Sequence, residues 1–351
     1  MNKSIVDLFK SITPIIQAPM AGVTNPKLVA AVSNSGAMGS FGFAYSTVEK
    51  IYSDLKEVRN LTKQPINTNF FIFKELQTPT ESDYKQAIEI LQSLPIINSI
   101  EYSIPSPPFF PELEKQLEPI WEYKPELLTF HFGIPPKHVI KKAHFLGMQV
   151  GVTATCLDEA QAIENSGVDF IVAQGIEAGG HRGTFDATGE HDTKLSAIDL
   201  LKSLTSHCRI PIISAGGMME GKDINNALNN GALAVQMGTA FLCCDESGKS
   251  SLYRDAIRTQ KERDTAYTNG FSGRWAQGIK NEFIKLMDKQ FILPFPFQNL
   301  ITSSLRSFAE TNNNIEYQSL WAGQEYKKIR LLPASKLIAE LIKQMKNANT
   351  I

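Results

Sequence analysis

The sequence has no long apolar run, so nothing in it predicts a membrane-spanning helix. Such a helix needs about 20 consecutive apolar residues, and the most hydrophobic short stretch, residues 291–297, is interrupted by Pro294 and Pro296. The first residues also lack the continuous apolar core and the cleavage site of a secretion signal. We therefore expect a cytoplasmic protein that has no membrane partner.

Neither sign of charge is in excess, and the cysteines are few. Lys and Arg number 35 against 36 Asp and Glu, which gives no sign of the basic face that a nucleic-acid partner needs. The 4 cysteines include no C-x-x-C pair, so we expect reduced thiols rather than disulfides. The spacing of the 6 histidines does not indicate a metal site.

A unit of helix, glycine and strand recurs along the chain. Four glycines each follow a helix-like segment and precede an apolar stretch: Gly36, Gly147, Gly167 and Gly231. A glycine in this position commonly ends a helix. Asn25, directly before a proline, supplies a helix N-cap. This order predicts βα units around a parallel sheet.

Eight candidate strands give the number that a closed barrel requires. They cover residues 15–20, 38–43, 66–73, 127–133, 149–155, 170–175, 211–216 and 233–241. We read the long connection after the third strand as an elaborated loop with helices near residues 82–94 and up to about residue 123. The predicted fold is an α/β (β/α)8 TIM barrel.

The region after the eighth strand departs from this rhythm. Residues 245–314 contain a charged helix at 252–263 and a glycine-rich turn at 270–273, and we predict a small inserted or lid domain there. Residues 1–244 and 315–351 would form the barrel. The stretch 317–345 is predicted to be helical with a break near Pro333, and would close the barrel.

Polar side chains gather at the C-terminal ends of the candidate strands, which converge on the face where TIM barrels keep their active sites. They are Gln17, Asn67, Asn69, His131, Thr153, Thr155, Gln174, Ser214, Gln236 and Thr239. A buried amide without a partner costs about 1–3 kcal/mol, so together they predict a polar ligand. For any one of them, such as Gln17, a hydrogen bond to a neighbouring loop is an equal alternative.

Glycine-containing turns follow the last two strands, at residues 214–218 and 236–239. Their backbone N–H groups can approach an anion, and loops at these places in a TIM barrel commonly bind phosphate. The ligand should therefore have a phosphate at one end and an edge of hydrogen-bonding groups at the other, and FMN has both. A phosphosugar also has the phosphate, but it would need fewer amide side chains to bind it.

The segment that ends the sixth strand carries the candidate for catalysis. Gln174 would reach the edge of the ring, Gly179 and Gly180 would let the backbone approach the cofactor, and His181 would stand over its reactive face. Histidine can take a proton near neutral pH. The alternative is a solvated loop histidine with Arg182 as a surface charge.

These motifs resemble the nitronate monooxygenase family, formerly called 2-nitropropane dioxygenase. The matching segments are residues 17–22, 172–175, 177–183, 215–217, 235–241, 271–273 and 320–324. The resemblance implies an FMN-containing barrel that oxidises alkyl nitronates, including propionate 3-nitronate, with molecular oxygen. The implied products are carbonyl compounds with nitrite or nitrate, formed through a flavin semiquinone, and neither a nicotinamide nor a metal is implied.

The same resemblance implies roles for particular residues, with His181 as the catalytic residue. The implied FMN contacts are Ala18, Pro19, Met20, Asn69, Gln174, Gly179, Gly180, Gly216, Gly217, Gln236, Met237, Gly238 and Thr239. Trp275 and Gln277 depart from the family pattern, in which a smaller residue and an arginine are usual. His131 either lines the pocket or belongs to the core.

Other functions stay open at this point. One is a flavin-dependent NAD(P)H:quinone or enoyl-thioester reductase on the same barrel, and another is a non-catalytic flavin-binding protein. A phosphosugar lyase or isomerase without flavin would need a strand-end acid such as Glu177. The expected partners are a nitronate or nitroalkane and O2, and we consider a homodimer as one arrangement of the chain.

Overall fold

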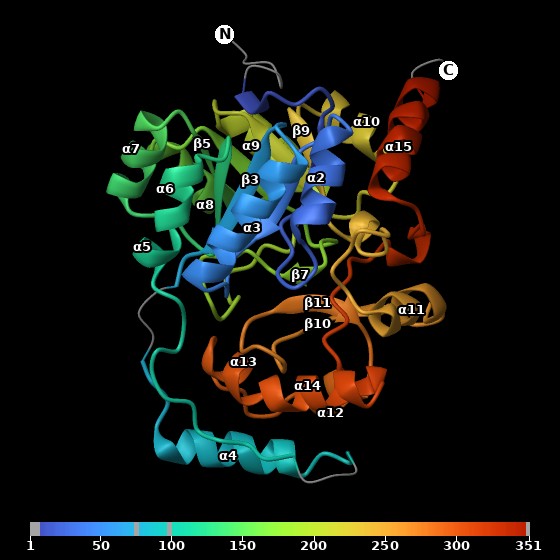
Figure 1. Cartoon of the computed structure of the whole chain (residues 1–351). Helices are drawn as coiled ribbons and strands as arrows, with labels where there is room; N and C mark the ends of the chain where they lie inside the picture. The colour runs from blue at the N-terminus through green and yellow to red at the C-terminus, as the bar shows by residue number, and fades with distance from the viewer. Residues whose placement is uncertain (1–7, 74–76, 97–99, 349–351) are drawn as a thin grey trace.

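The computed structural model describes residues 8–73, 77–96 and 100–348. Its central feature is a parallel sheet of eight strands in the order β1-β9-β8-β6-β5-β4-β3-β2. A bridge between Ile16 and Met38 joins the two edge strands, and the N–H of Met38 donates to the carbonyl of Ile15 at 2.9 Å. The sheet closes into the predicted (β/α)8 barrel with helices around it (Figure 1).

The barrel strands end earlier than the sequence predicts. They are β1 (Ile15–Gln17), β2 (Gly39–Gly42), β3 (Ile66–Phe71), β4 (Leu127–His131), β5 (Gln149–Ala154), β6 (Phe170–Gln174), β8 (Ile212–Ala215) and β9 (Ala234–Met237). The largest error is at residues 238–241, where the chain turns into the 3-10 helix η1 (Thr239–Phe241) and the N–H of Phe241 donates to the carbonyl of Gly238 at 2.9 Å. The residues beyond the strands form loops at one end of the barrel.

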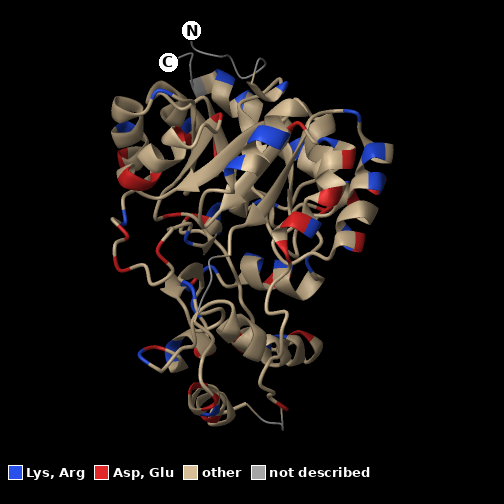
Figure 2. Ribbon diagram, turned by 90° about the vertical axis from the view of Figure 1, so that its left-hand side faces the viewer, with Lys and Arg blue, Asp and Glu red and all other residues tan. Residues whose placement is uncertain are grey.

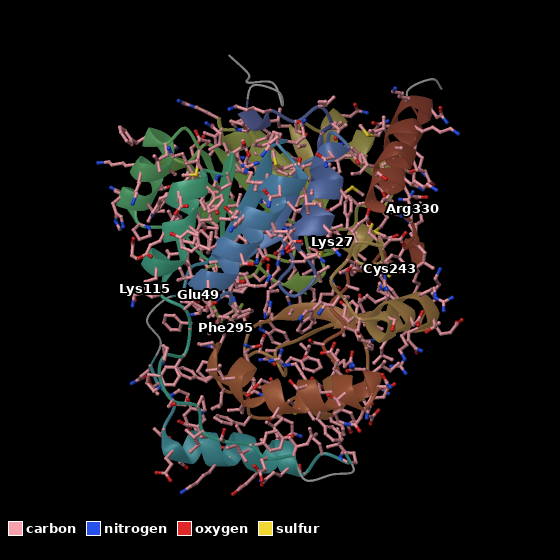
Figure 3. All side chains as sticks on the ribbon, viewed as in Figure 1. Lys27, Glu49, Lys115, Cys243, Phe295 and Arg330 are labelled. Carbon is pink, nitrogen blue, oxygen red and sulfur yellow. The ribbon has the colours of Figure 1, made fainter. Side chains whose placement is uncertain are left out.

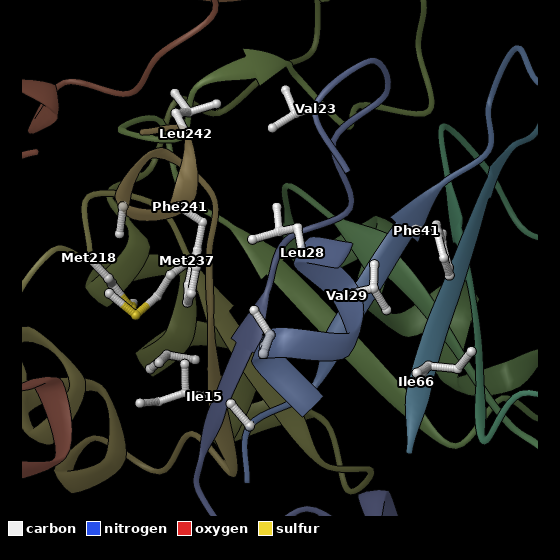
Figure 4. Close-up of a cluster of buried hydrophobic side chains, with 14 of the residues drawn as sticks. Ile15, Val23, Leu28, Val29, Phe41, Ile66, Met218, Met237, Phe241 and Leu242 are labelled. Atoms are coloured by element: carbon white, nitrogen blue, oxygen red, sulfur yellow. The ribbon is translucent and has the colours of Figure 1, made fainter. Parts of the chain in front are cut away.

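The helices around the barrel agree with the prediction at the N-cap Asn25 and at the four predicted helix-ending glycines. They are α2 (Pro26–Asn34), α3 (Val48–Leu61), α7 (Lys137–Phe145), α8 (Leu157–Asn165), α9 (Ala197–His207), α10 (Gly221–Asn229) and α15 (Ala334–Ala348). The Asn25 side chain accepts from the N–H of Leu28 at 2.9 Å and caps α2. The four predicted helix-ending glycines all have positive φ, between 82° and 97°. In Figure 4, Leu28 and Val29 of α2 lie in the same buried cluster as Ile15 of β1.

Residues 245–314 lie beyond the barrel loops, mostly below the barrel in Figure 1, but Tyr253, Ala256 and Ile257 of their first helix belong to the hydrophobic cluster of the barrel. Their elements are α11 (Ser251–Thr259), β10 (Thr265–Thr268), β11 (Ala276–Ile279), α12 (Glu282–Leu286), α13 (Phe297–Ile301) and α14 (Ser303–Thr311). A three-stranded antiparallel sheet runs in the order β10-β11-β7. Its third strand, β7 (Gly180–His181), comes from a barrel loop, and His181 pairs with Ala276. The backbone of His181 is thereby part of the inserted sheet.

The connection after β3 is more than an elaborated loop. Its helix α4 (Glu81–Gln92) buries Tyr84, Ala87 and Leu91 in one hydrophobic cluster with Phe271 and Phe283 of the inserted segment. Figure 1 shows α4 beyond α12 and α14, at the far end from the barrel. The chain then returns to the barrel through α5 (Leu113–Gln116) and α6 (Glu118–Tyr123).

The helix predicted over residues 317–345 is wrong in its first half. Only η2 (Ile315–Tyr317) and η3 (Tyr326–Lys328) are helical before α15, and both are short. Between them the chain passes the ends of β9 and β6, and the N–H of Gly323 donates to Oγ1 of Thr239, which follows β9, at 3.0 Å. The N–H of Gln324 donates to the carbonyl of Glu177 at 3.1 Å. These tertiary contacts outweigh the local helical pattern.

Both acidic and basic residues are spread over the outer helices (Figure 2). No helix within the described ranges is long and apolar enough to cross a membrane. Over the same ranges, no three or more His, Cys, Asp or Glu side chains are grouped so that they could hold a metal ion.

Candidate active site

A cavity of about 440 Å³ lies between the C-terminal ends of the barrel strands and the inserted segment, within the range of small-molecule sites. Every residue to which the family resemblance assigns a catalytic or FMN-binding role lines this cavity. They are His181, Ala18, Pro19, Met20, Asn69, Gln174, Gly179, Gly180, Gly216, Gly217, Gln236, Met237, Gly238 and Thr239. The fold therefore brings together segments that are far apart in the sequence.

The turns after β8 and β9 present unpaired backbone donors to the cavity. Within the described chain, the N–H groups of Gly216, Gly217 and Met218 form no hydrogen bond, and neither do those of Gly238 and Thr239. Gly216 has φ +117° and Gly217 has φ +69°, backbone conformations that favour glycine. We call these five donors the amide cradle. It has the character of an anion site.

The amide side chains at the strand ends divide into two groups. Gln236 lines the cavity and its amide has no hydrogen-bond partner in the described part of the chain. Gln174 is occupied, because its Nε2 donates to the carbonyl of His181 at 3.0 Å and its Oε1 accepts from the N–H of Gly183 at 2.7 Å. Gln174 therefore positions the His181 loop whether or not it also contacts a ligand.

Several polar side chains of the predicted ring lie outside the cavity lining. Oε1 of Gln17 accepts from the N–H of Ser40 at 3.0 Å, and Nδ2 of Asn67 donates to the hydroxyl of Ser40 at 3.1 Å. Thr155 donates to Glu159 at 2.8 Å. These side chains therefore bond to neighbouring protein groups, which is the alternative to ligand binding that the sequence left open.

Glycine is favoured at the two positions before His181 for different physical reasons. A Cβ at Gly179 would lie 2.4 Å from the backbone of Ala322, whereas a Cβ at Gly180 would meet no atom within 4 Å. Gly180 instead has φ +74°. Residue 179 is thus restricted by the crossing chain and residue 180 by its backbone conformation.

His181 is held from several sides. Its Nε2 lies 2.9 Å from the hydroxyl of Ser272 in the inserted segment, and its carbonyl oxygen lies 3.3 Å from Nε2 of His131. Aromatic rings surround the imidazole: the centroids of Phe295 and Trp321 are 6.0 and 5.7 Å away. Figure 3 places Phe295 between the barrel and the inserted layer.

Both histidines of the cavity are neutral. Burial, then the neighbouring His131 and the guanidinium groups of Arg274 and Arg306, lower the pKa of His181 to about 3. Burial and then Arg274 lower the pKa of His131 to about 3 as well. Arg274 lies with its guanidinium carbon 3.8 Å from the ring centroid of Phe132 and donates to the carbonyl of Thr184.

Arg182 is not the surface charge of the alternative interpretation. Its side chain is 1% exposed and binds Asp192 through two nitrogens, at 2.9 and 2.8 Å. It also donates to the carbonyl of Gln174. Removing one partner of such a buried pair commonly costs about 3–5 kcal/mol, so this ion pair fixes the loop that follows His181.

Comparison with known proteins agrees with this geometry. A sequence profile described as nitronate monooxygenase matches residues 2–344. This chain belongs to the nitronate monooxygenase family. It is 37% identical to the nitronate monooxygenase of Pseudomonas aeruginosa over 344 residues, which are 95% of this chain and 96% of that protein.

Other members of the nitronate monooxygenase family are as similar. A probable nitronate monooxygenase of Staphylococcus haemolyticus is 36% identical over 351 residues, 96% of this chain and 95% of that protein. The crystal structure of nitroalkane oxidase from Streptomyces ansochromogenes superposes with a TM-score of 0.91 at 32% identity and covers 99% of each chain. The protein is thus a family enzyme for flavin-dependent oxidation of nitronates or nitroalkanes.

The sequence analysis missed the cavity wall that the inserted segment supplies. Ser272, Lys249 and Arg306 received no role, although the first contacts His181 and the other two line the cavity. Ser272 lies in the matched segment 271–273, which could have drawn attention to it. No local signal marks Lys249 or Arg306, because both lie outside the barrel strands, whose alternation fixes where side chains point.

The two positions that depart from the family pattern both hold the His181 loop. Nε1 of Trp275 donates to the carbonyl of Thr188 at 2.8 Å. Nε2 of Gln277 donates to the carbonyls of Ile176 and Ala178 at 3.0 and 2.8 Å. An arginine has comparable donors, so Gln277 preserves the hydrogen bonding without the charge.

Proposed function

We propose that this enzyme binds FMN in the cavity and oxidises alkyl nitronates with O2, yielding carbonyl compounds with nitrite or nitrate. The observation that carries the proposal is one cavity lined both by the amide cradle and by the neutral imidazole of His181. The family to which the chain belongs supports the choice of reaction.

The residues present fit FMN. A phosphate would accept from the amide cradle, because unpaired N–H groups in positive-φ turns are a usual phosphate site. The free amide of Gln236 has both a donor and an acceptor for the ring edge. Ala18 and Met20 line the cavity beside Gly238 and would pack beside the ring, as the family resemblance implies.

Bound FMN would supply the redox chemistry, by taking electrons from the nitronate and passing them to O2. The protein's part is to bind and orient the substrate in a cavity lined with aromatic rings. The His181 imidazole is a weak base at a pKa of about 3, whereas an efficient general base titrates near the working pH. The site therefore suits a nitronate, which has already lost its α-proton, better than a neutral nitroalkane.

The sequence-based alternatives predict different behaviour. The carboxylate of Glu177, the acid considered for a phosphosugar enzyme, accepts from the N–H of Ala197 at 2.9 Å and so holds the start of α9. A reductase would consume NADH with a quinone or an enoyl thioester, and a non-catalytic flavoprotein would retain FMN without turnover. Both differ from the proposed enzyme in simple assays.

The test is a visible spectrum of the purified protein, followed by oxygen uptake with propionate 3-nitronate. We expect a flavin spectrum and oxygen uptake that does not need NADH. A flavin-containing protein that takes up no oxygen with any nitronate but oxidises NADH would replace this proposal with the reductase.

The division into a barrel (residues 1–244 and 315–351) and an inserted domain (245–314) stays a proposal, as does the homodimer. The shared hydrophobic cluster supports adding α4 to the inserted unit. The one-electron route expected from the family resemblance also stays a prediction.

A further inference from the structure

The contact between His181 and Ser272 bears on which ring nitrogen of His181 carries the proton. Both cavity histidines are neutral, so each ring holds one proton. A neutral imidazole donates from one nitrogen and accepts at the other. Nε2 of His181 lies 2.9 Å from the hydroxyl of Ser272. A hydroxyl is able to act in either direction, so the other partners of Ser272 decide the direction of this hydrogen bond.

Ser272 is held by a tight turn between β10 and β11. Its N–H and that of Gly273 donate to the carbonyl of Asn269 at 3.2 and 2.7 Å. Gly273 has φ +84°, and a Cβ there would lie 2.4 Å from the carbonyl oxygen of Leu293. Ser272 is 2% exposed, so the partners of its hydroxyl are protein groups rather than solvent.

The hydroxyl of Ser272 contacts both polar groups of the Arg274 backbone. It donates to the carbonyl of Arg274 at 3.0 Å and accepts from the N–H of Arg274 at 3.3 Å. A hydroxyl has one proton to donate and two lone pairs that accept. Its proton and one lone pair are thus in use, and the lone pair that remains accepts from Nε2–H of His181.

The opposite direction leaves a polar group unpaired. If the hydroxyl donated to His181 instead, the carbonyl of Arg274 would have no donor among the described residues. Arg274 is 5% exposed, and a buried carbonyl without a donor is costly. The hydrogen bonds of the turn therefore favour the proton on Nε2 of His181.

Nδ1 of His181 is then the nitrogen with a free lone pair. It forms no hydrogen bond within the described chain, and it is not one of the buried side-chain atoms that lack a partner. Because His181 lines the cavity, Nδ1 is open to the space where a substrate would lie. His131 has the same tautomer for a simpler reason: its Nε2 lies 3.3 Å from the carbonyl of His181, and a carbonyl only accepts.

We propose that Ser272 is a positioning residue that keeps the proton of His181 on Nε2, so that Nδ1 faces the substrate as the proton acceptor. In the reaction of a neutral nitroalkane, the α C–H bond breaks, its electron pair moves into the nitro group to form the nitronate, and the proton goes to Nδ1. The resulting imidazolium keeps its hydrogen bond from Nε2 to Ser272. This inference rests on the proposed function, and Ser272 itself does not line the cavity.

The test is a nitrogen NMR spectrum of the FMN-loaded enzyme with isotopically labelled histidine rings. In a neutral imidazole the protonated nitrogen resonates far upfield of the unprotonated one, so the spectrum reports the tautomer. The signals of His181 are identified by their loss in His181→Asn. We expect Nε2 of His181 to be the protonated nitrogen. A His181 ring that is protonated on Nδ1 overturns the proposal.

Ser272→Ala removes the acceptor of the Nε2 proton. We expect His181 to populate both tautomers, so that its two nitrogen signals move toward each other. The kcat for nitroethane should fall about tenfold, which is part of what a positioned base contributes. Turnover of the nitronate of nitroethane should change less than about threefold, because no proton is removed from it. Ser272→Thr keeps the hydroxyl and should restore the Nε2 signature and the turnover.

Ser33→Ala is the matched control. Ser33 is also buried, donates to the carbonyl of Pro65 at 2.8 Å and accepts from the N–H of Gly39 at 3.1 Å, but it does not line the cavity. Its replacement should lower stability and leave the His181 signals and both turnovers unchanged. Retained FMN and cooperative unfolding show that each variant is folded. Should Ser272→Ala fail to fold, the wild-type spectrum is itself the test.

The outcomes separate this inference from the proposed function. Unchanged His181 signals in folded Ser272→Ala, or equal losses of nitroalkane and nitronate turnover, overturn the role of Ser272. An FMN-loaded wild type that takes up no oxygen with any nitronate overturns the proposed function, whereas the wild-type spectrum still reports the tautomer of His181.

Discussion

At the scale of single residues, the unusual feature of the site is an imidazole kept neutral by its surroundings. His181 is buried beside another neutral histidine and near two guanidinium groups, which together lower its pKa to about 3. A neutral imidazole leaves Arg306 and Lys249 as the cationic side chains that line the cavity in the described part of the chain.

Replacing His181 with Asn should separate the two classes of substrate. We expect nitroalkane turnover, which is slow in the wild type because the imidazole is a weak base, to fall by at most about 100-fold, the lower end of what a positioned general base contributes, because only the nitroalkane needs an α-proton removed. Nitronate turnover should fall less than about tenfold. Oxygen uptake with nitroethane and with its nitronate measures both, at equal FMN content, and equal losses would argue against a role in proton transfer.

The depressed pKa of His131 predicts how stability depends on pH. Between pH 6.5 and about 3, the unfolded chain binds a proton at this histidine that the folded chain does not. Folding is therefore favoured by the neutral histidine above pH 6.5, and this contribution is lost as the pH falls towards 3. In this pH window, His131→Gln should reduce the slope of the free energy of unfolding against pH by about 1 kcal/mol per pH unit.

Denaturant unfolding at pH 4, 5, 6 and 7 measures that slope. The matched control is His207→Gln, an exposed histidine on α9, which should leave the slope unchanged. Identical slopes for His131→Gln and the wild type would contradict a neutral buried imidazole.

At the scale of the structural elements, the turns after β8 and β9 are shaped to leave their amides free. Gly217→Ala forces a side chain onto a residue with φ +69° and brings its Cβ 3.2 Å from Cβ of Glu177. The turn would have to relax, which moves the amide cradle. We expect FMN affinity to fall by roughly tenfold or more, since the strain is about 1–3 kcal/mol.

Gly167→Ala is the control for this change. Gly167 ends α8 with φ +86° and has no atom within 4 Å of an added Cβ, so the alanine carries a similar backbone strain far from the cavity. It should lower stability and leave FMN affinity unchanged. Fluorescence titration of the apoproteins with FMN gives both affinities, and equal losses in the two variants would mean that the turn after β8 does not bind the phosphate.

The sequence was sufficient to predict those elements whose signals are local. The glycine after each helix, the N-cap at Asn25 and the apolar strands are short-range features, and the barrel follows from their order. Residues 317–332 were predicted to be helical and form no α-helix, because the N–H groups of Gly323 and Gln324 donate to Thr239 and Glu177 instead. The eighth strand was predicted too long, because the chain turns at Gly238 while the residues that follow it are still apolar.

Among the site residues, those next to strand ends could be predicted, since strand position fixes where they point. Arg306 and Lys249 could not, because their segment has no barrel register and only packing brings it over the cavity. Gln174 was placed correctly at the cavity, but its hydrogen bonds to the His181 loop could not be foreseen from its strand alone.

At the scale of the whole molecule, the inserted layer and the barrel share the site. The inserted sheet includes the backbone of His181, and α4 covers the far side of the same layer. A loss of order in the inserted unit would therefore reach the cavity.

Leu91→Ala tests whether α4 belongs to that unit. Leu91 is 1% exposed in the shared cluster, and its truncation should cost about 2–5 kcal/mol. We expect faster hydrogen exchange over residues 265–311 with little change in β4 and β5. Exchange that rises only within residues 81–92 would show that α4 is an independent appendage, and the exposed Leu61→Ala of α3 serves as the control.

The central claim is that FMN lies at the C-terminal face of the barrel with its phosphate in the amide cradle. A crystal structure of the FMN-loaded enzyme measures this directly. We predict phosphate oxygens within hydrogen-bond distance of the N–H groups of Gly216, Gly217 and Gly238, with the ring facing His181. A phosphate bound elsewhere, or a protein that binds no FMN, would contradict the account.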